Sequence, residues 1–237
     1  MLVALVVFIA AVVQGIAGFG GALVAMPLLV PLLGIQIASP AFAMVAMIAT
    51  LLNAIRWRAF TTPRDLTRLL LPALIGILLG VWLLASLDAA IITRILGGLI
   101  VLYAGYALLG LPVPRPNHSA WTYTAGFSSG LLSGAFNTGG PPAVMFASAS
   151  QWEPNRFRGN LQAFFLFSSI VVTISHALAG HYSSETLRAV LWALPALLAG
   201  HIIGYRLCLF VNPAFFRRLV LVMLLLLGAR LLIFVGS

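Results

Sequence analysis

The apolar positions of this chain fall into eight long segments separated by short polar stretches. Within a segment the apolar residues continue without the strict alternation of a half-exposed β-strand. Most segments are close to the roughly 20 residues that a helix needs to cross a bilayer, about twice the length of a barrel strand. The pattern therefore predicts an all-α, polytopic helical membrane protein. The segments cover residues 2–33, 38–55, 69–87, 91–111, 120–150, 160–180, 187–210 and 214–235.

The first and fifth segments are too long for one ordinary crossing. Each contains a double glycine near its middle, at Gly20-Gly21 and at Gly139-Gly140. Glycine adopts left-handed backbone conformations without a steric penalty, so it interrupts a helix readily. We therefore expect each long segment to form a hairpin of two shorter helices.

A proline-rich stretch at 112–119 divides the chain nearly in half. Its three prolines and one arginine cannot lie in hydrocarbon as a helix, which predicts a water-facing linker loop. The linker leaves one transmembrane repeat at 1–111 and a second at 120–237. Three matches in the same order indicate a duplication. They pair Gln14–Gly21 with Ser133–Gly140, Pro72–Gly80 with Pro195–Gly204, and Asp88 and Arg94 with Asn212 and Arg218.

The composition excludes a soluble protein. Of the 237 residues, 62% are hydrophobic and 7% are charged, whereas soluble domains carry about 25% charged residues. The 13 basic residues are all arginine and outnumber four acids. A basic balance can indicate nucleic-acid binding, but these arginines lie between apolar segments rather than on one helical face. They therefore indicate membrane topology.

The arginine positions predict how the two repeats are oriented. If each long segment turns at its glycines and returns to its starting side, most arginines collect on one side. That arrangement obeys the positive-inside rule, whereas one crossing per long segment does not. Three full crossings per repeat then invert the second repeat relative to the first. The predicted cytoplasmic side carries Arg56, Arg58, Arg64, Arg68, Arg115, Arg156, Arg158, Arg217 and Arg218, and the other keeps Arg94 and Arg188.

Both glycine motifs resemble those of a known family. Gln14 to Pro27 (QGIAGFGGALVAMP) is similar to the first motif of the sulfite exporter TauE/SafE family, and Gly130 to Pro142 (GLLSGAFNTGGPP) is similar to its second motif. Segment number, length and duplication agree, so the resemblance covers essentially the whole chain. It implies bacterial inner-membrane transport of sulfite or organosulfur anions, often outward. Ala22 and Pro141 depart from it, because a third glycine is common there.

The glycine breaks also predict an anion site. In transporters built from inverted repeats, substrates bind near the midplane where broken helices meet. A helix that starts after a break presents unpaired N–H groups and the positive end of its dipole, which together attract anions. The alternative is that the glycines serve only helix packing. The predicted ligands at the breaks are Gly18, Gly20, Gly21, Gly139 and Gly140.

Polar side chains in or beside the apolar segments are further candidate ligands. Polar groups in a membrane helix usually face the interior or a cavity. Asn137 and Thr138 could bind substrate, cap the helix that follows, or both. Arg158 could instead be an interfacial cation that reaches the headgroups. The candidates are Asn53, Asn137, Thr138, Arg158, Asn160 and Gln162.

Two histidines and one serine motif allow other chemistry. His176 and His201 lie in apolar segments, where they could relay protons or stay neutral and hydrogen-bonded between helices; we favour the second interpretation. Residues 126–130 match the G-x-S-x-G pattern, so an intramembrane serine hydrolase using Ser128 and His176 is an alternative. That pattern requires a strand–turn–helix context, whereas small residues here favour helix packing. A non-transporting scaffold is a third class. Neither alternative explains the paired breaks.

We therefore expect a secondary transporter, not an enzyme, for a small anion in the lipid bilayer. An interior-negative membrane drives an anion outward by about 2.3 kcal/mol per charge per 100 mV, so export needs no coupling ion. We expect a multi-pass protein of the bacterial inner membrane with periplasmic termini. We expect no cofactor, metal or nucleic-acid partner. A homodimer is one possible assembly. The helix contacts are expected at Gly76, Gly80, Gly200 and Gly204.

Overall fold

The computed structural model describes residues 1–111 and 119–233. Every regular element in these ranges is helical, which confirms the predicted all-α fold class. The elements are α1 (Leu2–Ala17), α2 (Gly21–Leu33), α3 (Ile35–Trp57), the 3-10 helix η1 (Arg58–Phe60), α4 (Pro63–Ser86), α5 (Ala89–Leu108), α6 (Ser119–Phe136), α7 (Gly140–Ala149), α8 (Pro154–Leu178), α9 (Ser184–Leu207) and α10 (Pro213–Ile233).

Long apolar helices confirm that the protein is polytopic. In the described ranges, α3, α4, α5, α8 and α9 are long and apolar enough to cross a membrane. The helix α10 has 21 residues and carries three arginines. Both long segments are broken at the predicted glycines, the first into α1 and α2 and the second into α6 and α7. At 1.5 Å per residue, α2 is about 20 Å long and α7 about 15 Å, both shorter than a hydrocarbon core of about 30 Å.

The chain forms two compact units, and each unit takes helices from both sides of the predicted linker. Unit 1 consists of Met1–Val45, Ser86–Leu111 and Tyr182–Ser237, and unit 2 of Ala46–Ala85 and Pro112–His181. These packing units differ from the two sequence repeats, which remain a prediction. The predicted linker at 112–119 lies outside the described residues except for its last position, which begins α6.

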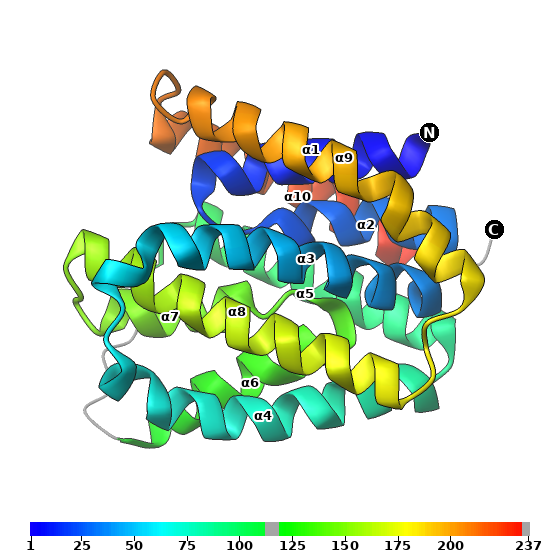
Figure 1. The fold of residues 1–237 in the computed structure, drawn as a ribbon, viewed down its shortest axis with the longest axis horizontal. Coiled ribbons are helices and arrows are strands. Elements are labelled where there is room, and N and C mark those ends of the chain that lie inside the picture. Colours follow the sequence, from blue (N-terminus) through cyan, green and yellow to red (C-terminus); the bar gives the residue numbers. More distant parts are fainter. Residues whose placement is uncertain (112–118, 234–237) are drawn as a thin grey trace. The chain divides into compact units, whose positions relative to one another are not determined.

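Glycines bring the helices of unit 1 together. The helix α1 packs along α9 (Figure 1), and α5 packs along α10. A Cβ added to Gly200 of α9 would lie 2.5 Å from the carbonyl oxygen of Phe8 in α1. A Cβ on Gly97 of α5 would lie 2.8 Å from the carbonyl oxygen of Gly228 in α10. Small residues let helix backbones approach closely where lipid supplies no hydrophobic driving force.

Unit 2 contains a second contact of the same kind, between α4 and α6. A Cβ on Gly76 or Gly80 of α4 would overlap the backbone of α6, and Gly130 of α6 meets the backbone of Ala73. These glycine contacts confirm the predicted helix-packing role. Beside them, a core joins α4, α6, α7 and α8, formed by Leu66, Leu69, Ala73, Ala125, Ala143, Phe146, Ala147, Leu161 and Phe164.

The α1–α9 and α4–α6 contacts use matching residues of the two sequence halves. Gly200 meets the carbonyl of Phe8, and its counterpart Gly76 meets the carbonyl of Phe127. Phe8 and Phe127 are separated by 119 residues (127 − 8), the same separation that relates the two glycine motifs. The second glycine of each pair repeats the relation, with Gly204 against Val12 and Gly80 against Leu131.

Matching helices also run antiparallel inside each unit. In unit 2 the hydroxyls of Thr50 in α3 and Ser169 in α8 are 2.8 Å apart, at a sequence separation of 119. Further along α3, the Trp57 ring lies under Arg158, nearer the start of α8, with the guanidinium carbon 5.1 Å from the ring centroid. In unit 1, Gly97 of α5 lies beside the end of α10 around Leu231. The later α5 residues 100 and 101 lie beside position 228, so α5 and α10 are also antiparallel.

Candidate anion site at the helix breaks

The first break lies in unit 1, between α1 and α2. Gly18 ends α1 in a left-handed conformation, with φ 79°, and its N–H donates to the carbonyl oxygen of Gln14 at 2.8 Å. Gly20 is also left-handed, with φ 91°, and α2 begins at Gly21. A side chain at either left-handed position would strain the backbone, so glycine is required for the turn itself. The predicted residues Gly18, Gly20 and Gly21 therefore all lie at the break.

The start of α2 has the features of an anion-binding end. Among the described residues, no side chain caps this helix at Gly20. The first helical N–H groups consequently lack an acceptor from the helix, and the dipole is positive here. Gln14 of α1 lies against Gly21, because its side-chain oxygen occupies the space that a Cβ on Gly21 would need. A polar side chain and free N–H groups are thus brought together by the hairpin.

The second break, in unit 2, repeats the left-handed turn with asparagine. Asn137 has φ 57°, and its N–H donates to the carbonyl oxygen of Ser133 at 2.9 Å. Asn137 and Gly18 are 119 residues apart (137 − 18) and make the same hydrogen bond. Asparagine is one of the few residues other than glycine that tolerates this conformation. Asn137 therefore follows the end of α6. The N-cap of α7 is Gly139, and not Asn137 or Thr138 as the sequence suggested.

The start of α7 is also uncapped, but its chemistry differs. In the described part of the chain, no side chain caps α7, and Gly139 has an ordinary right-handed φ of −67°. Gly139 is needed for space instead, because the hydroxyls of Ser129 and Ser133 lie where its Cβ would be. The Ser129 hydroxyl donates to the Gly139 carbonyl. Gly140, the other predicted glycine, is the first residue of α7.

Ser129, Ser133 and Thr138 are buried polar residues at the second break. The prediction included Thr138 but missed the two serines. Ser133 could have been found, because it matches Gln14 in the aligned motifs and both side chains lie against the glycines of the break. Ser129 had no comparable signal, since it lies in a run of small residues that is also typical of helix packing.

The remaining predicted ligands of unit 2 lie along α3 and α8. Asn160 is fully buried, and its Oδ1 accepts from the N–H of Thr62 at 2.7 Å. One residue earlier, Gly159 accepts from the Thr61 hydroxyl at 3.3 Å. Arg158 is exposed and lies over the Trp57 ring. These contacts attach the start of α8 to η1 and the residues that follow it.

Gln162 and Asn53 complete the predicted set. Gln162 is buried on α8, two residues beyond Asn160. Asn53 is half-buried on α3, and its Nδ2 atom has no hydrogen-bond partner within the ranges the structure describes. A buried amide nitrogen without an acceptor is costly, which makes Asn53 a polar group available to a ligand.

The histidines and the serine motif have ordinary helical surroundings. His176 is buried, as expected, but it bonds to His181 in the loop after α8 and not across to another long helix. His201 is half-buried in α9. Ser128 lies within α6, and its hydroxyl donates to the carbonyl oxygen of Thr124 in the previous turn. The helical context of Ser128 lacks the geometry of a nucleophile elbow.

Comparisons with known proteins identify the chain. The family model described as sulfite exporter TauE/SafE matches residues 3–231. The protein is 28% identical over 184 residues to a Cupriavidus necator protein named "Probable sulfite/organosulfonate exporter TauE", covering 77% of this chain and 70% of that protein. No solved structure matches. Because the family consists of membrane transporters, the hydrolase and scaffold alternatives are set aside. The chain belongs to the sulfite exporter TauE/SafE family.

Proposed function

We propose that this transporter exports sulfite or an organosulfonate across the bacterial inner membrane, and that the anion binds at the glycine breaks. The substrate class is supported by the family and by the name of the Cupriavidus necator relative. The observation that carries the binding site is the recurrence of an uncapped helix start. In both hairpins this start follows a left-handed residue whose N–H bonds to the matching position, Gln14 or Ser133.

Backbone N–H groups are the main proposed ligands. At α2 the N–H groups of Gly21, Ala22 and Leu23 precede the first intrahelical bond, which Val24 makes to Gly20. An oxyanion there would accept several charge-assisted hydrogen bonds without a cationic side chain. At α7 the two residues after Gly140 are prolines, which have no N–H. The α2 end therefore supplies more backbone donors than the α7 end.

In unit 2, polar side chains are proposed as ligands at the second break and along α3 and α8. Thr138, Asn137, Gln162 and Asn53 are proposed to contribute polar contacts in unit 2. For Arg158 and Asn160, the bonds to the η1 region favour a role in holding the start of α8. Arg158 is therefore not proposed as a direct ligand.

The proposal includes inverted repeats with cytoplasmic arginine-rich loops and periplasmic termini. Inversion requires that matching helices run in opposite directions. The antiparallel pairs α3–α8 and α5–α10 support this, as does the bond between the matched residues Thr50 and Ser169. A membrane potential that is negative inside drives the anion outward whichever way the protein is oriented.

Purified protein in proteoliposomes tests the function directly. We expect efflux of radiolabelled sulfite or of an organosulfonate such as sulfoacetate, accelerated by a potential that is negative inside. Sulfate and taurine serve as comparison substrates. Vesicles that carry none of these anions faster than protein-free vesicles would refute the proposed function.

A reciprocal pair of variants tests the binding site. Ala22→Pro removes one N–H from the start of α2 and copies Pro141, which lies 119 residues further along the chain (141 − 22). Proline is tolerated in the first turn of a helix, so folding should be retained. Losing one charge-assisted hydrogen bond should weaken anion binding by about 1.5–3 kcal/mol, or roughly tenfold to a hundredfold.

Pro141→Ala is the opposite change, because it adds an N–H to the start of α7. It should leave binding unchanged or strengthen it, at similar stability. Anion binding is measured as substrate-dependent thermal stabilisation. If Ala22→Pro unfolds like the parent and still binds and carries the anion equally well, the α2 end is not the site.

A further inference from the structure

Two histidines are in direct contact at the end of α8, His176 in the last turn of the helix and His181 in the loop that follows. The Nδ1 atoms of His176 and His181 are 2.9 Å apart, and the ring centroids are 5.2 Å apart. The backbone fixes this arrangement. Gly180 is left-handed, with φ 72°, its N–H donates to Ala177, and the N–H of His181 donates to the carbonyl oxygen of His176 at 3.0 Å. These two bonds form a Schellman motif.

A Schellman motif alone does not explain a histidine pair. The residues in these two positions usually make an apolar contact, and leucines would close the helix end equally well. His176 is 0% exposed, and its Nε2 has no hydrogen-bond partner in the part of the chain that the structure describes. A buried imidazole with one nitrogen unsatisfied destabilises the fold. Its presence points to a use beyond capping.

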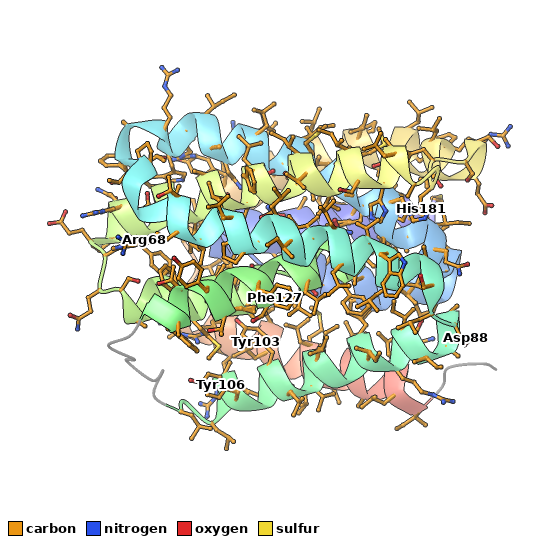
Figure 2. All side chains as sticks on the ribbon, turned by 90° about the horizontal axis from the view of Figure 1, so that it is seen from below. Arg68, Asp88, Tyr103, Tyr106, Phe127 and His181 are labelled. Carbon is orange, nitrogen blue, oxygen red and sulfur yellow. The ribbon has the colours of Figure 1, made fainter. Side chains whose placement is uncertain are left out.

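His181 is the titratable side chain that faces His176. The helix α7 contains no titratable residue, and α6 contributes only the exposed Tyr123. On α3 and η1 the charges, Arg56 and Arg58, lie at the other end of α8, where Trp57 meets Arg158. The charges of α4 lie in its first turns. Figure 2 shows its Arg68 at the end of unit 2 opposite His181.

We propose that the His176–His181 pair is a proton-binding site that couples proton entry to anion export. This proposal rests on the proposed transport function. One proton lies in the Nδ1···Nδ1 hydrogen bond, so one ring donates and the other accepts. The neutral pair binds one further proton on a ring nitrogen outside that bond and becomes a cation. Both rings cannot be cationic while the bond persists.

The pair connects the surface with the interior. His181 is partly exposed, so it can take a proton from water, whereas His176 is buried. In the cationic pair, moving the bridging proton from His181 to His176 transfers the positive charge inward. The step requires no reactant other than the proton. With the orientation proposed above, this end of unit 2 is periplasmic. Proton uptake there in exchange for an outgoing anion would add the proton gradient to the driving force.

The test separates proton binding from helix capping with an apolar replacement. In His176→Leu/His181→Leu the usual hydrophobic contact of a Schellman motif is restored, so the variant should fold at least as stably as the parent. Proteoliposomes with pyranine report proton movement during sulfite efflux. We expect protons to enter the parent's vesicles as the anion leaves, and the double variant to lose that signal and the effect of an imposed pH gradient. His201→Gln is the control and should behave like the parent.

The contradicting results are equally specific. A stable double leucine variant that moves protons with sulfite as the parent does would show that the pair is only a cap. If the parent carries no anion at all, the proposed function fails, and ¹⁵N NMR of histidine-labelled protein still decides the proton site. The pair should then take up one shared proton as the pH falls below the ordinary histidine pKa of about 6.5. Two histidines that titrate independently, or a pair that stays neutral throughout, would overturn the proposal.

Discussion

Gly200→Ala offers a quantitative test of the packing between α1 and α9. The added Cβ would lie 2.5 Å from the carbonyl oxygen of Phe8 and 2.9 Å from the Cβ of Ala11. Ordinary contact begins at 3.4 Å, so the two helices must separate by almost 1 Å. The first contact is with backbone, which cannot rotate away as a flexible side chain can.

Two opposing effects set the size of the change. Forcing an extra methyl group into a packed contact costs about 1–3 kcal/mol, and contact with backbone places this site at the upper end. Alanine improves helix propensity over glycine by about 1 kcal/mol. The net loss should be about 2 kcal/mol, which lowers the Tm of a chain of this size by about 4–8 °C.

The matched control is Gly105→Ala in α5. A Cβ there would meet nothing within 4 Å, so only the propensity effect remains. We expect the Tm to rise by about 2–4 °C. Both variants are compared with the parent in one detergent by tryptophan fluorescence during heating. Gly76→Ala should resemble Gly200→Ala, because it makes the matching contact with Phe127. If Gly200→Ala melts at the same temperature as the parent or at a higher one, the contact argument is wrong.

Three further predictions follow from other parts of the chain. In a protein with Cys208 replaced, a cysteine at exposed Ala59 should resist an impermeant reagent added outside intact cells, whereas a cysteine at exposed Glu185 should react; the reverse pattern would overturn the orientation. Burial lowers the pKa of His181 below its ordinary 6.5, so its contribution to stability is complete above that pH and declines as the pH falls. His181→Gln should flatten the decline in a pH series of thermal unfolding. Asn137→Gly should melt like the parent, whereas Asn137→Ala should lose about 1–2 kcal/mol because alanine resists the left-handed conformation; equal stabilities would show that φ is not the constraint.

The helix breaks and the glycine contacts could be predicted because their signals are local. A double glycine inside an overlong apolar segment is informative before any partner helix is known. The same holds for Gly76 and Gly200, since small residues spaced four apart indicate a helix contact in any membrane protein. The sequence did not show which helices meet. The pairing of α1 with α9, and of α4 with α6, depends on contacts between distant segments.

The roles of individual polar residues were harder to predict because one residue type serves several purposes. Asn137 was predicted to be a ligand or an N-cap, but its left-handed backbone is visible only in the structure. Asn160 looks like a ligand by composition, yet its side chain bonds to Thr62. His176 finds its partner five residues later, through a turn that Gly180 makes. In each case the deciding contact comes from backbone conformation rather than from residue identity.

Comparison of the two breaks indicates how a duplicated structure can acquire different chemistry at its two ends. The left-handed turn is maintained in both, by glycine at position 18 and by asparagine at 137. The positions after the turn have diverged, with Ala22 and Leu23 in one hairpin matched by two prolines in the other. Proline preserves the start of a helix but removes an N–H, so the divergence changes the number of donors without changing the fold. Ser129 and Ser133 bring hydroxyl groups to the end that has lost backbone donors. The two breaks have therefore kept one backbone geometry while acquiring different hydrogen-bonding groups.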